Sequence, residues 1–244
     1  MTARILSMVI GYFFGCFLTA ELVAHRYAHT GASALGDTGN PGMANIMASL
    51  GFVPGILTLA GDIGKCIAAA LVSYACFRET GTITMLYAGL GCTLGHDFPF
   101  WRGFRGGKGV ATTSITVFLY AMPLGLMANI AGMAVVFLTK YLCIGGPVIP
   151  LSFAVFMLLQ EKKEAAVIGL VLTVLSLRAH ASSLQGIRTG RTKKTDVLGA
   201  LRKKLRKNNR QDKTIWTGEK KMQCERSEER RVGKECRSRW SPYH

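Results

Sequence analysis

Charged side chains are scarce over most of this sequence. Residues 1–177 contain 17 Asp, Glu, Lys and Arg residues, whereas the 67 residues that follow contain 27. Several apolar helices without charged faces would lack the outer polar layer of a soluble protein, so the pattern favours a membrane protein over a soluble helical core. Acidic residues are few throughout, with 14 Asp and Glu against 30 Lys and Arg, and the formal net charge is +16. The chain therefore divides into an apolar body and a basic tail.

Cysteines with the spacing of metal ligands are also lacking. Of the seven cysteines, five are scattered through the apolar body. This distribution is typical of small core residues and supports neither a disulfide framework nor a zinc site. We therefore expect no metal site. The five cysteines are Cys16, Cys66, Cys76, Cys92 and Cys143.

The end of the chain, residues 226–244, differs sharply from what precedes it. It resembles, residue for residue, the translation of a common sequencing-library adaptor. We interpret it as an assembly artefact, to be left out of fold reasoning, and expect the genuine C-terminus to be lost. Without it the formal net charge is +13, so the tail is still basic.

Apolar segments predict an all-α, polytopic membrane protein with about seven transmembrane helices. The first, residues 5–24, is interrupted only by Glu21 and is long enough to cross a bilayer. It lacks a small-residue cleavage site, so we expect a retained helix rather than a signal peptide. Shorter segments are tolerated where neighbouring helices shield them or the bilayer thins. The other segments are residues 52–77, 82–94, 110–121, 124–141, 148–159 and 165–177.

Positive charge predicts the orientation in the membrane. Residues 178–221 carry fourteen Lys and Arg against three acidic residues, and the positive-inside tendency places them in the cytoplasm. With seven crossings, the N-terminus lies outside. Three connections then lie on the cytoplasmic side, at residues 25–51, 95–109 and 140–147, and they contain every Gly-rich polar loop of the apolar body.

One of these connections contains Gly-Phe-Arg-Gly-Gly-Lys-Gly, residues 103–109. Glycines permit positive φ and a close backbone approach, so amides such as those of Gly106 and Gly107 can form an anion nest. Arg105 and Lys108 add positive charge, and the loop runs into a predicted helix whose N-terminus favours an anion. The spacing differs from a P-loop, since glycine follows the lysine where Ser or Thr would hold magnesium. The pattern predicts a phosphate site; the alternative is a turn whose cations only enforce the topology.

Other ionisable residues lie near this loop or within the spans. His96 and Asp97 directly precede it, where a His could titrate near neutrality, donate a hydrogen bond or be merely structural. Asp62 and Lys65 lie three residues apart inside an apolar span, on one face of the predicted helix. Ions inside a membrane are costly unless they are paired or face a cavity, so both a structural ion pair and a contact with the site stay open.

The other connections carry polar groups as well. The first contains neutral donors and acceptors among glycines, which suit hydroxyls and phosphate oxygens, although it could also be a polar turn. The third, residues 139–147, contains Lys140 followed by two glycines. His180 and Ser183 follow the last apolar segment on the same predicted face of the membrane. The polar residues of the first connection are Thr38, Asn40 and Asn45.

Three loop motifs resemble those of the bacterial acyl-phosphate-dependent glycerol-3-phosphate acyltransferases, the PlsY family, and the resemblance covers residues 5–192. The family's second loop, Gly-His-x-Phe-Pro followed by Phe-Lys-Gly-Gly-Lys-Gly-Val-Ala-Thr, is matched here with Arg105 in place of the first Lys. Its first loop is Ser-Gly-Asn-x-Gly-x-x-Asn, and its third is Thr-Arg-Tyr-x-Ser-x-Gly. The matching positions are Gly95, His96, Phe98, Pro99 and 104–112, then Thr38, Gly39, Asn40, Gly42 and Asn45, then Thr139, Lys140, Tyr141, Cys143 and Gly145.

Four departures concern residues with which the family holds the acceptor. Thr38 and Cys143 stand where the family has Ser, and Ala48 stands where it has Arg. Ser183 replaces the Asn of a His-x-x-Asn pair whose His is matched by His180. Loss of the Arg removes a bidentate phosphate partner, and such charge-assisted bonds are roughly twice as strong as neutral ones. The phosphate loop therefore matches the family more closely than the acceptor site does.

The resemblance implies transfer of a fatty acyl group from acyl phosphate to the first hydroxyl of sn-glycerol 3-phosphate, at the cytoplasmic face of the cell (inner) membrane. The products would be lysophosphatidic acid and phosphate. No cofactor is implied, because a mixed anhydride is already activated. The expected partners are the two substrates and the lipid bilayer, and no nucleic acid is expected; the sequence predicts no oligomeric state. Lys108 and His180 are the expected catalytic residues. The expected substrate-binding residues are Thr38, Gly39, Asn40, Asn45, His96, Arg105, Gly106, Gly107, Lys108, Lys140, Cys143 and Ser183.

Two other functions stay open. One is a paralogue that binds phospholipid precursors without turnover or takes another acceptor. The other is a transporter for an organic phosphate, although the inverted repeats expected of one are not evident. By domain, residues 1–192 form the predicted membrane acyltransferase and residues 193–225 a basic cytoplasmic tail, followed by the artefact. Leu-Arg-Lys-Lys-Leu-Arg-Lys in that tail resembles a polybasic patch for anionic lipid, with nucleic-acid binding or a solvated charge run as alternatives.

Overall fold

The structure is a computed structural model that describes residues 1–36, 39–192 and 194. Every regular element among these residues is a helix, which confirms the predicted all-α class. The elements are α1 (Thr2–Cys16), α2 (Thr19–Ala28), η1 (Ala32–Ala34), α3 (Met43–Leu50), α4 (Phe52–Cys76), η2 (Arg78–Thr80), α5 (Ile83–Asp97), η3 (Phe100–Arg102), α6 (Val110–Tyr120), α7 (Met122–Thr139), α8 (Leu142–Leu159) and α9 (Lys163–Arg188).

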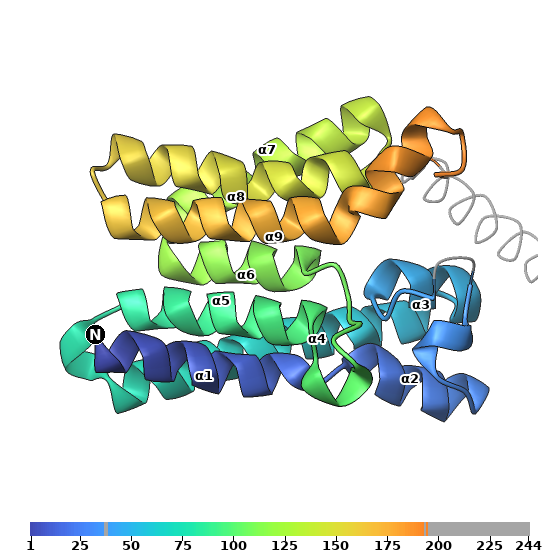
Figure 1. Cartoon of the computed structure of the whole chain (residues 1–244), viewed down its shortest axis with the longest axis horizontal. Coiled ribbons are helices and arrows are strands. Elements are labelled where there is room, and N and C mark those ends of the chain that lie inside the picture. The colour runs from blue at the N-terminus through green and yellow to red at the C-terminus, as the bar shows by residue number, and fades with distance from the viewer. Residues whose placement is uncertain (37–38, 193, 195–244) are drawn as a thin grey trace, which may run out of the picture. The chain divides into compact units, whose positions relative to one another are not determined.

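Five helical stretches among the described residues are long and apolar enough to cross a membrane, by length and composition. Helices α5 and α6 are shorter, at 15 and 11 residues. Both lie inside the bundle, where α5 packs against α1, α4, α6 and α9 and α6 packs against α4, α5, α7 and α8 (Figure 1). Neighbouring helices thus shield them, as the sequence analysis expected of short apolar segments. The five stretches are Thr2–Ala28, Phe52–Cys76, Met122–Thr139, Leu142–Leu159 and Lys163–Arg188.

Glycines bring α1 and α5 into backbone contact. A Cβ atom added at Gly11 or Gly15 would overlap the carbonyl oxygens of Ala88 or Cys92. Conversely, a Cβ atom added at Gly91 would overlap a carbonyl oxygen of α1. Small residues at a helix crossing allow this close packing where lipid supplies no hydrophobic drive for association. The crossing fixes the C-terminal end of α5, which carries His96 and Asp97, against α1.

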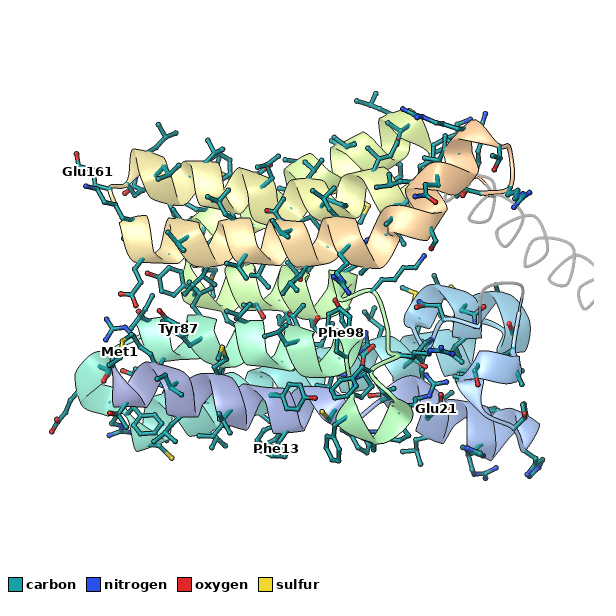
Figure 2. The ribbon with its side chains drawn as sticks, viewed as in Figure 1. Met1, Phe13, Glu21, Tyr87, Phe98 and Glu161 are labelled. Carbon is teal, nitrogen blue, oxygen red and sulfur yellow. The ribbon has the colours of Figure 1, made fainter. Side chains whose placement is uncertain are left out.

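The connections at one end of the bundle contain the predicted polar loops. Figure 1 shows α2, α3, the segment between α5 and α6, and the C-terminal part of α9 toward this end. Figure 2 shows Glu21 and Phe98 on this side and Met1, Tyr87 and Glu161 toward the opposite end. The helices therefore place the polar clusters together, as the alternation of apolar segments predicts.

Two predicted boundaries near the site are wrong. The third connection was expected over residues 140–147, but α8 begins at Leu142 and only Lys140 and Tyr141 connect it to α7. Its two glycines serve helix packing, because a Cβ atom at Gly145 would overlap Val136 of α7. The last helix was expected to end at Leu177, but α9 continues to Arg188 through Ala, Leu, Gln and Arg, which favour helices.

Candidate functional site

The segment between α5 and α6, residues 98–109, is called the glycine loop here. It folds back onto the last turn of α5, where the Gly106 amide donates to the Asp97 carbonyl and the Gly107 amide to the His96 carbonyl, each at 2.9 Å. These bonds satisfy carbonyls that the end of a helix leaves open. The two amides that the sequence analysis assigned to phosphate are thus engaged within the protein. Donors toward an anion are therefore sought in the first amides of α6 and in the Lys108 ammonium.

Lys108 lies at the end of the glycine loop and reaches the last helix. Its side chain is half-buried, and its Nζ atom donates to the Ser183 hydroxyl at 2.7 Å. Burial disfavours the charged form and lowers the pKa of Lys108. An ammonium in such partly water-excluded surroundings attracts an anion more strongly than one in open water. Arg105, the other predicted cation of this loop, is exposed.

His180 lies one turn before Ser183 on α9 and is 1% exposed. Its Nδ1 atom is 2.9 Å from the Ser176 carbonyl oxygen. A carbonyl oxygen only accepts hydrogen bonds, so Nδ1 carries the proton and Nε2 of the neutral ring carries a lone pair. Within the described part of the chain, nothing hydrogen-bonds to that Nε2 atom. Residues three apart on a helix are neighbours, so the contact of Lys108 with Ser183 places Lys108 near His180 as well.

Residues predicted to bind substrate make contacts in the described part of the first loop, residues 29–36 and 39–42. The side-chain Nδ2 atom of Asn45, on α3, donates to the Leu35 carbonyl at 2.9 Å and so holds this part of the loop against α3. Gly39 has a φ of +55°, and a Cβ atom there would also approach the Ser33 carbonyl oxygen at 2.7 Å. Asn40 is half-buried. Thr38 lies outside the described residues.

The two substrate-binding residues predicted from the third connection, Lys140 and Cys143, differ in their exposure to solvent. Lys140 is exposed at the C-terminal end of α7, with a φ of +62°. Cys143 is buried in the first turn of α8. It lines a cavity of about 200 Å³, which continues along α8 and α9 between Ile144, Pro147, Val148, Leu151, Thr173, Leu177 and Leu184.

Glu21 connects the two loops, a role that the sequence analysis missed. Its Oε1 atom pairs with Arg102 of the glycine loop at 2.8 Å, and its Oε2 atom accepts from the Ala32 amide of the first loop at 2.9 Å. The available signal was an acidic residue inside an apolar segment, since such residues usually have a partner and a role. From the sequence alone, Glu21 stands out only as an interruption of the apolar segment.

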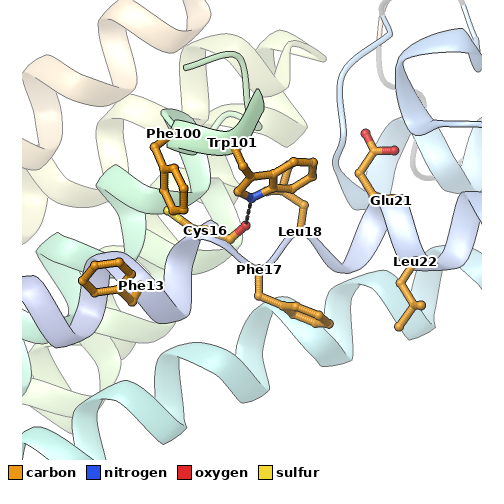
Figure 3. A pocket seen from close by; sticks show the side chains of 8 residues that line it. All are labelled: Phe13, Cys16, Phe17, Leu18, Glu21, Leu22, Phe100 and Trp101. Carbon is orange, nitrogen blue, oxygen red and sulfur yellow. Dashed lines mark hydrogen bonds between the residues drawn. The ribbon is translucent and has the colours of Figure 1, made fainter. Parts of the chain in front are cut away.

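Trp101 attaches the glycine loop to the bend between α1 and α2. Figure 3 shows its indole Nε1 donating to the Cys16 carbonyl oxygen, at 2.8 Å. That carbonyl is available because α1 ends at Cys16. The indole borders a mainly apolar groove of about 500 Å³, lined by Phe13, Cys16, Phe17, Leu18, Glu21, Leu22, Phe100 and Trp101. The break in the first span therefore helps to position the loop.

Comparison with known proteins identifies the family. The family model described as glycerol-3-phosphate acyltransferase matches residues 5–190. The chain belongs to this family. It is 38% identical over 199 residues to glycerol-3-phosphate acyltransferase 1 of Lactobacillus johnsonii, covering 82% of this chain and 96% of that one. It is 33% identical over 192 residues to the glycerol-3-phosphate acyltransferase of Alkaliphilus metalliredigens, covering 78% and 95%.

Solved structures agree in fold with this acyltransferase. The crystal structure of PlsY, an integral membrane glycerol 3-phosphate acyltransferase, in its glycerol 3-phosphate form aligns with a TM-score of 0.70 at 23% identity, covering 81% of this chain and 98% of that one. The lysophosphatidic acid form aligns at 0.66 and 22% identity, covering 78% and 94%. Together with family membership, this fold confirms the resemblance drawn from the loop motifs and makes the chain a membrane acyltransferase.

Proposed function

We propose that this acyltransferase moves a fatty acyl group from acyl phosphate to the sn-1 hydroxyl of glycerol 3-phosphate, giving lysophosphatidic acid and phosphate. In this reaction the bond between the acyl carbon and the phosphate oxygen breaks, and an ester bond to the glycerol oxygen forms. The hydroxyl proton ends on the released phosphate or in solvent. The observation that carries the proposal is the contact of Lys108 with Ser183, one helical turn from the buried Nε2 atom of His180, which has no hydrogen-bond partner among the described residues.

Lys108 and His180 take different parts in this scheme. The Lys108 ammonium, with the first amides of α6, binds a substrate phosphate and compensates the charge that develops as the anhydride breaks. The lone pair on His180 Nε2 accepts the hydrogen of the glycerol hydroxyl and orients its oxygen toward the acyl carbon. Exposed Arg105 and Lys140 raise the local concentration of anionic substrates. Residues of the first loop, Thr38 among them, orient the acceptor, and no cofactor is needed.

The proposed arrangement in the membrane has seven crossings, with α5 and α6 completing the five longer ones. The N-terminus lies outside, and the glycine loop faces the cytoplasm of the cell, as the positive charge after α9 favours. The cavity between α8 and α9 starts at Cys143 and is apolar along its length, so it suits the acyl chain. Cysteines introduced at Lys140 and at Lys162, in a Cys76→Ser background, test the orientation. An impermeant thiol reagent should label only position 162 in intact cells.

The decisive assay uses purified protein in lipid with acyl phosphate and labelled glycerol 3-phosphate. We expect labelled lysophosphatidic acid and about a hundredfold lower turnover for Lys108→Ala, as for the loss of one charge-stabilising donor. Lys162→Ala is the matched control, because Lys162 is exposed and directly follows Glu161, which Figure 2 shows at the opposite end of the bundle, so turnover should be unchanged. Full activity in Lys108→Ala would refute the assigned site. Phosphate release without a labelled lipid would refute this acceptor.

An altered acceptor is the second candidate function. Ala48 stands where the resembling family has Arg, and the Ala48 side chain is exposed on α3. The site then has one fewer bidentate partner for the acceptor phosphate. If glycerol 3-phosphate is the acceptor, Ala48→Arg should lower its KM. Should the variant lose activity toward a neutral acceptor while gaining none with glycerol 3-phosphate, the altered acceptor is supported instead.

A further inference from the structure

Asp62 and Lys65 of α4 form a buried ion pair beneath the glycine loop. Their side chains are each 4% exposed, and Lys65 Nζ lies 2.9 Å from Asp62 Oδ1. Burying two charges costs several kcal/mol per ion, and their mutual attraction offsets this only when further hydrogen bonds are made. The additional partners of the pair therefore indicate what it does.

Lys65 makes three hydrogen bonds besides the ion pair. Its Nζ atom donates to the Phe17 carbonyl at 2.9 Å and to the Gly15 carbonyl at 3.3 Å, both at the end of α1. The third bond joins Nζ to the Nδ1 atom of His96 at 2.9 Å. An ammonium has three N–H groups and no lone pair, so Lys65 can only donate, and these three partners and the Asp62 carboxylate share its N–H groups.

This geometry determines which nitrogen of His96 carries the proton. Because the Lys65 ammonium can only donate, Nδ1 must accept, and the proton of the neutral imidazole is then on Nε2. The ring lies against the glycine loop: a Cβ atom added at Gly107 would overlap it, with Nε2 as the nearest atom. The Nε2–H group thus faces the residue that directly precedes Lys108.

We propose that Lys65, charge-balanced by Asp62, is a positioning residue that holds His96 as the Nε2–H tautomer beside the phosphate-binding Lys108. Lys65 acts through His96 and does not touch substrate. The proposal rests on the proposed function for the identity of the anion that His96 faces. His96 then presents a donor suited to a phosphate or acyl oxygen, whereas His180 presents an acceptor suited to a hydroxyl. The two histidines are therefore held in opposite tautomers by Lys65 and by the Ser176 carbonyl.

The first test measures the tautomer directly and needs no turnover. Nitrogen NMR of ¹⁵N-histidine-labelled protein in lipid, assigned by a His96→Gln variant, should show an unprotonated Nδ1 and a protonated Nε2 at His96. Lys65→Met should shift His96 toward the other tautomer or a mixture, whereas Lys65→Arg, which keeps the donors and the charge, should retain Nε2–H. A protonated Nδ1 at His96 in the unaltered protein would overturn the proposal.

The second test separates positioning from general damage to the fold. We expect Lys65→Met to lower kcat/KM about tenfold or more, the range for loss of a hydrogen bond to a charged group. Adding Lys65→Met to His96→Ala should lower kcat/KM almost no further, because Lys65 acts through His96 and that residue is already lost. If the loss of kcat/KM in the double variant equals the product of the losses in the two single variants, the proposal is overturned. If Lys65→Met fails to fold, the NMR spectra of the Lys65→Arg variant and of the unaltered protein still show which tautomer His96 adopts. If the unaltered protein acylates no glycerol 3-phosphate, the proposed function fails while the tautomer is still measured.

Discussion

Two ionic clusters join helices at opposite ends of this bundle, and they differ mainly in their exposure to solvent. At one end, where Figure 2 labels Tyr87, the Tyr87 hydroxyl donates to Glu164 Oε1 at 2.9 Å, and Arg4 Nη2 donates to Glu164 Oε2 at 2.9 Å. The paired side chains of Arg4 and Glu164 are 31% and 42% exposed. At the other end, Asp62 and Lys65 are almost completely buried and extend to His96.

The difference in exposure indicates that the two clusters have different roles. An exposed ion pair contributes at most about 1 kcal/mol, because water competes for both charges. Removing one partner of a buried pair instead leaves an uncompensated charge in a low dielectric. The pair is therefore a poor source of stability, and its contact with His96 agrees with the positioning role proposed above.

Removing one charge of the buried pair should have the greatest effect on stability. Asp62→Leu leaves the Lys65 charge buried without its counterion, so we expect the free energy of unfolding to fall by about 3–5 kcal/mol. Denaturant unfolding in mixed micelles measures this change. The comparable change at the exposed cluster, Glu164→Leu, is the control. Equal losses at both ends would contradict the contrast between the clusters.

Replacing both residues of the buried pair tests whether the pair serves stability or the reaction. Asp62→Leu combined with Lys65→Met removes both charges, and such replacements of buried pairs are often neutral or stabilising. We therefore expect stability to recover to within about 1 kcal/mol of the unaltered protein. Turnover should stay about tenfold low, because the His96 tautomer is no longer held. Recovery of both stability and turnover would mean that the pair is only structural.

Alkaline pH should affect the site end through Lys108. Burial lowers the pKa of Lys108, so its positive charge is present at low pH and is lost at a lower pH than for an exposed lysine. The KM for glycerol 3-phosphate should be lowest below this pKa and rise by up to about tenfold per pH unit above it, as one proton is lost. Lys108→Arg should remove this rise, because Arg stays protonated. An unchanged alkaline profile in Lys108→Arg would exclude Lys108 as its source.

Much of the fold follows from the sequence because lipid imposes a strong pattern on it. All seven apolar segments correspond to helical stretches, and the glycine loop was predicted between two of them. The predicted helix boundaries are wrong where glycines serve the packing of helices instead of a loop. Gly145 and Gly146 are typical of a loop in the sequence, yet they lie inside α8. The chain needs glycine at these positions because a Cβ atom at either would crowd a neighbouring helix.

For the candidate site, the sequence predicts which residues lie together better than it predicts the bonds between them. Lys108 and Ser183, which are 75 residues apart, are in contact, and His180 lies one helical turn before Ser183. The engagement of the Gly106 and Gly107 amides by carbonyls of α5 depends on how the loop folds back, which spacing does not encode. The bond between Lys65 and His96 joins residues 31 apart on two helices, so it depends on tertiary packing.

The smallest expected effect is at the exposed cluster. Arg4→Ala removes a bidentate pair to Glu164, but the charge left behind stays hydrated, so the free energy of unfolding should fall by at most about 1 kcal/mol. Salt should reduce even this difference, because exposed charges are screened. Turnover should be unchanged, since Arg4 lies at the end away from the glycine loop. Parallel unfolding curves and assays at low and high salt measure both quantities. A large loss of turnover would mean that the two ends of the bundle are coupled, and the buried cluster could then no longer be singled out as the one that serves the reaction.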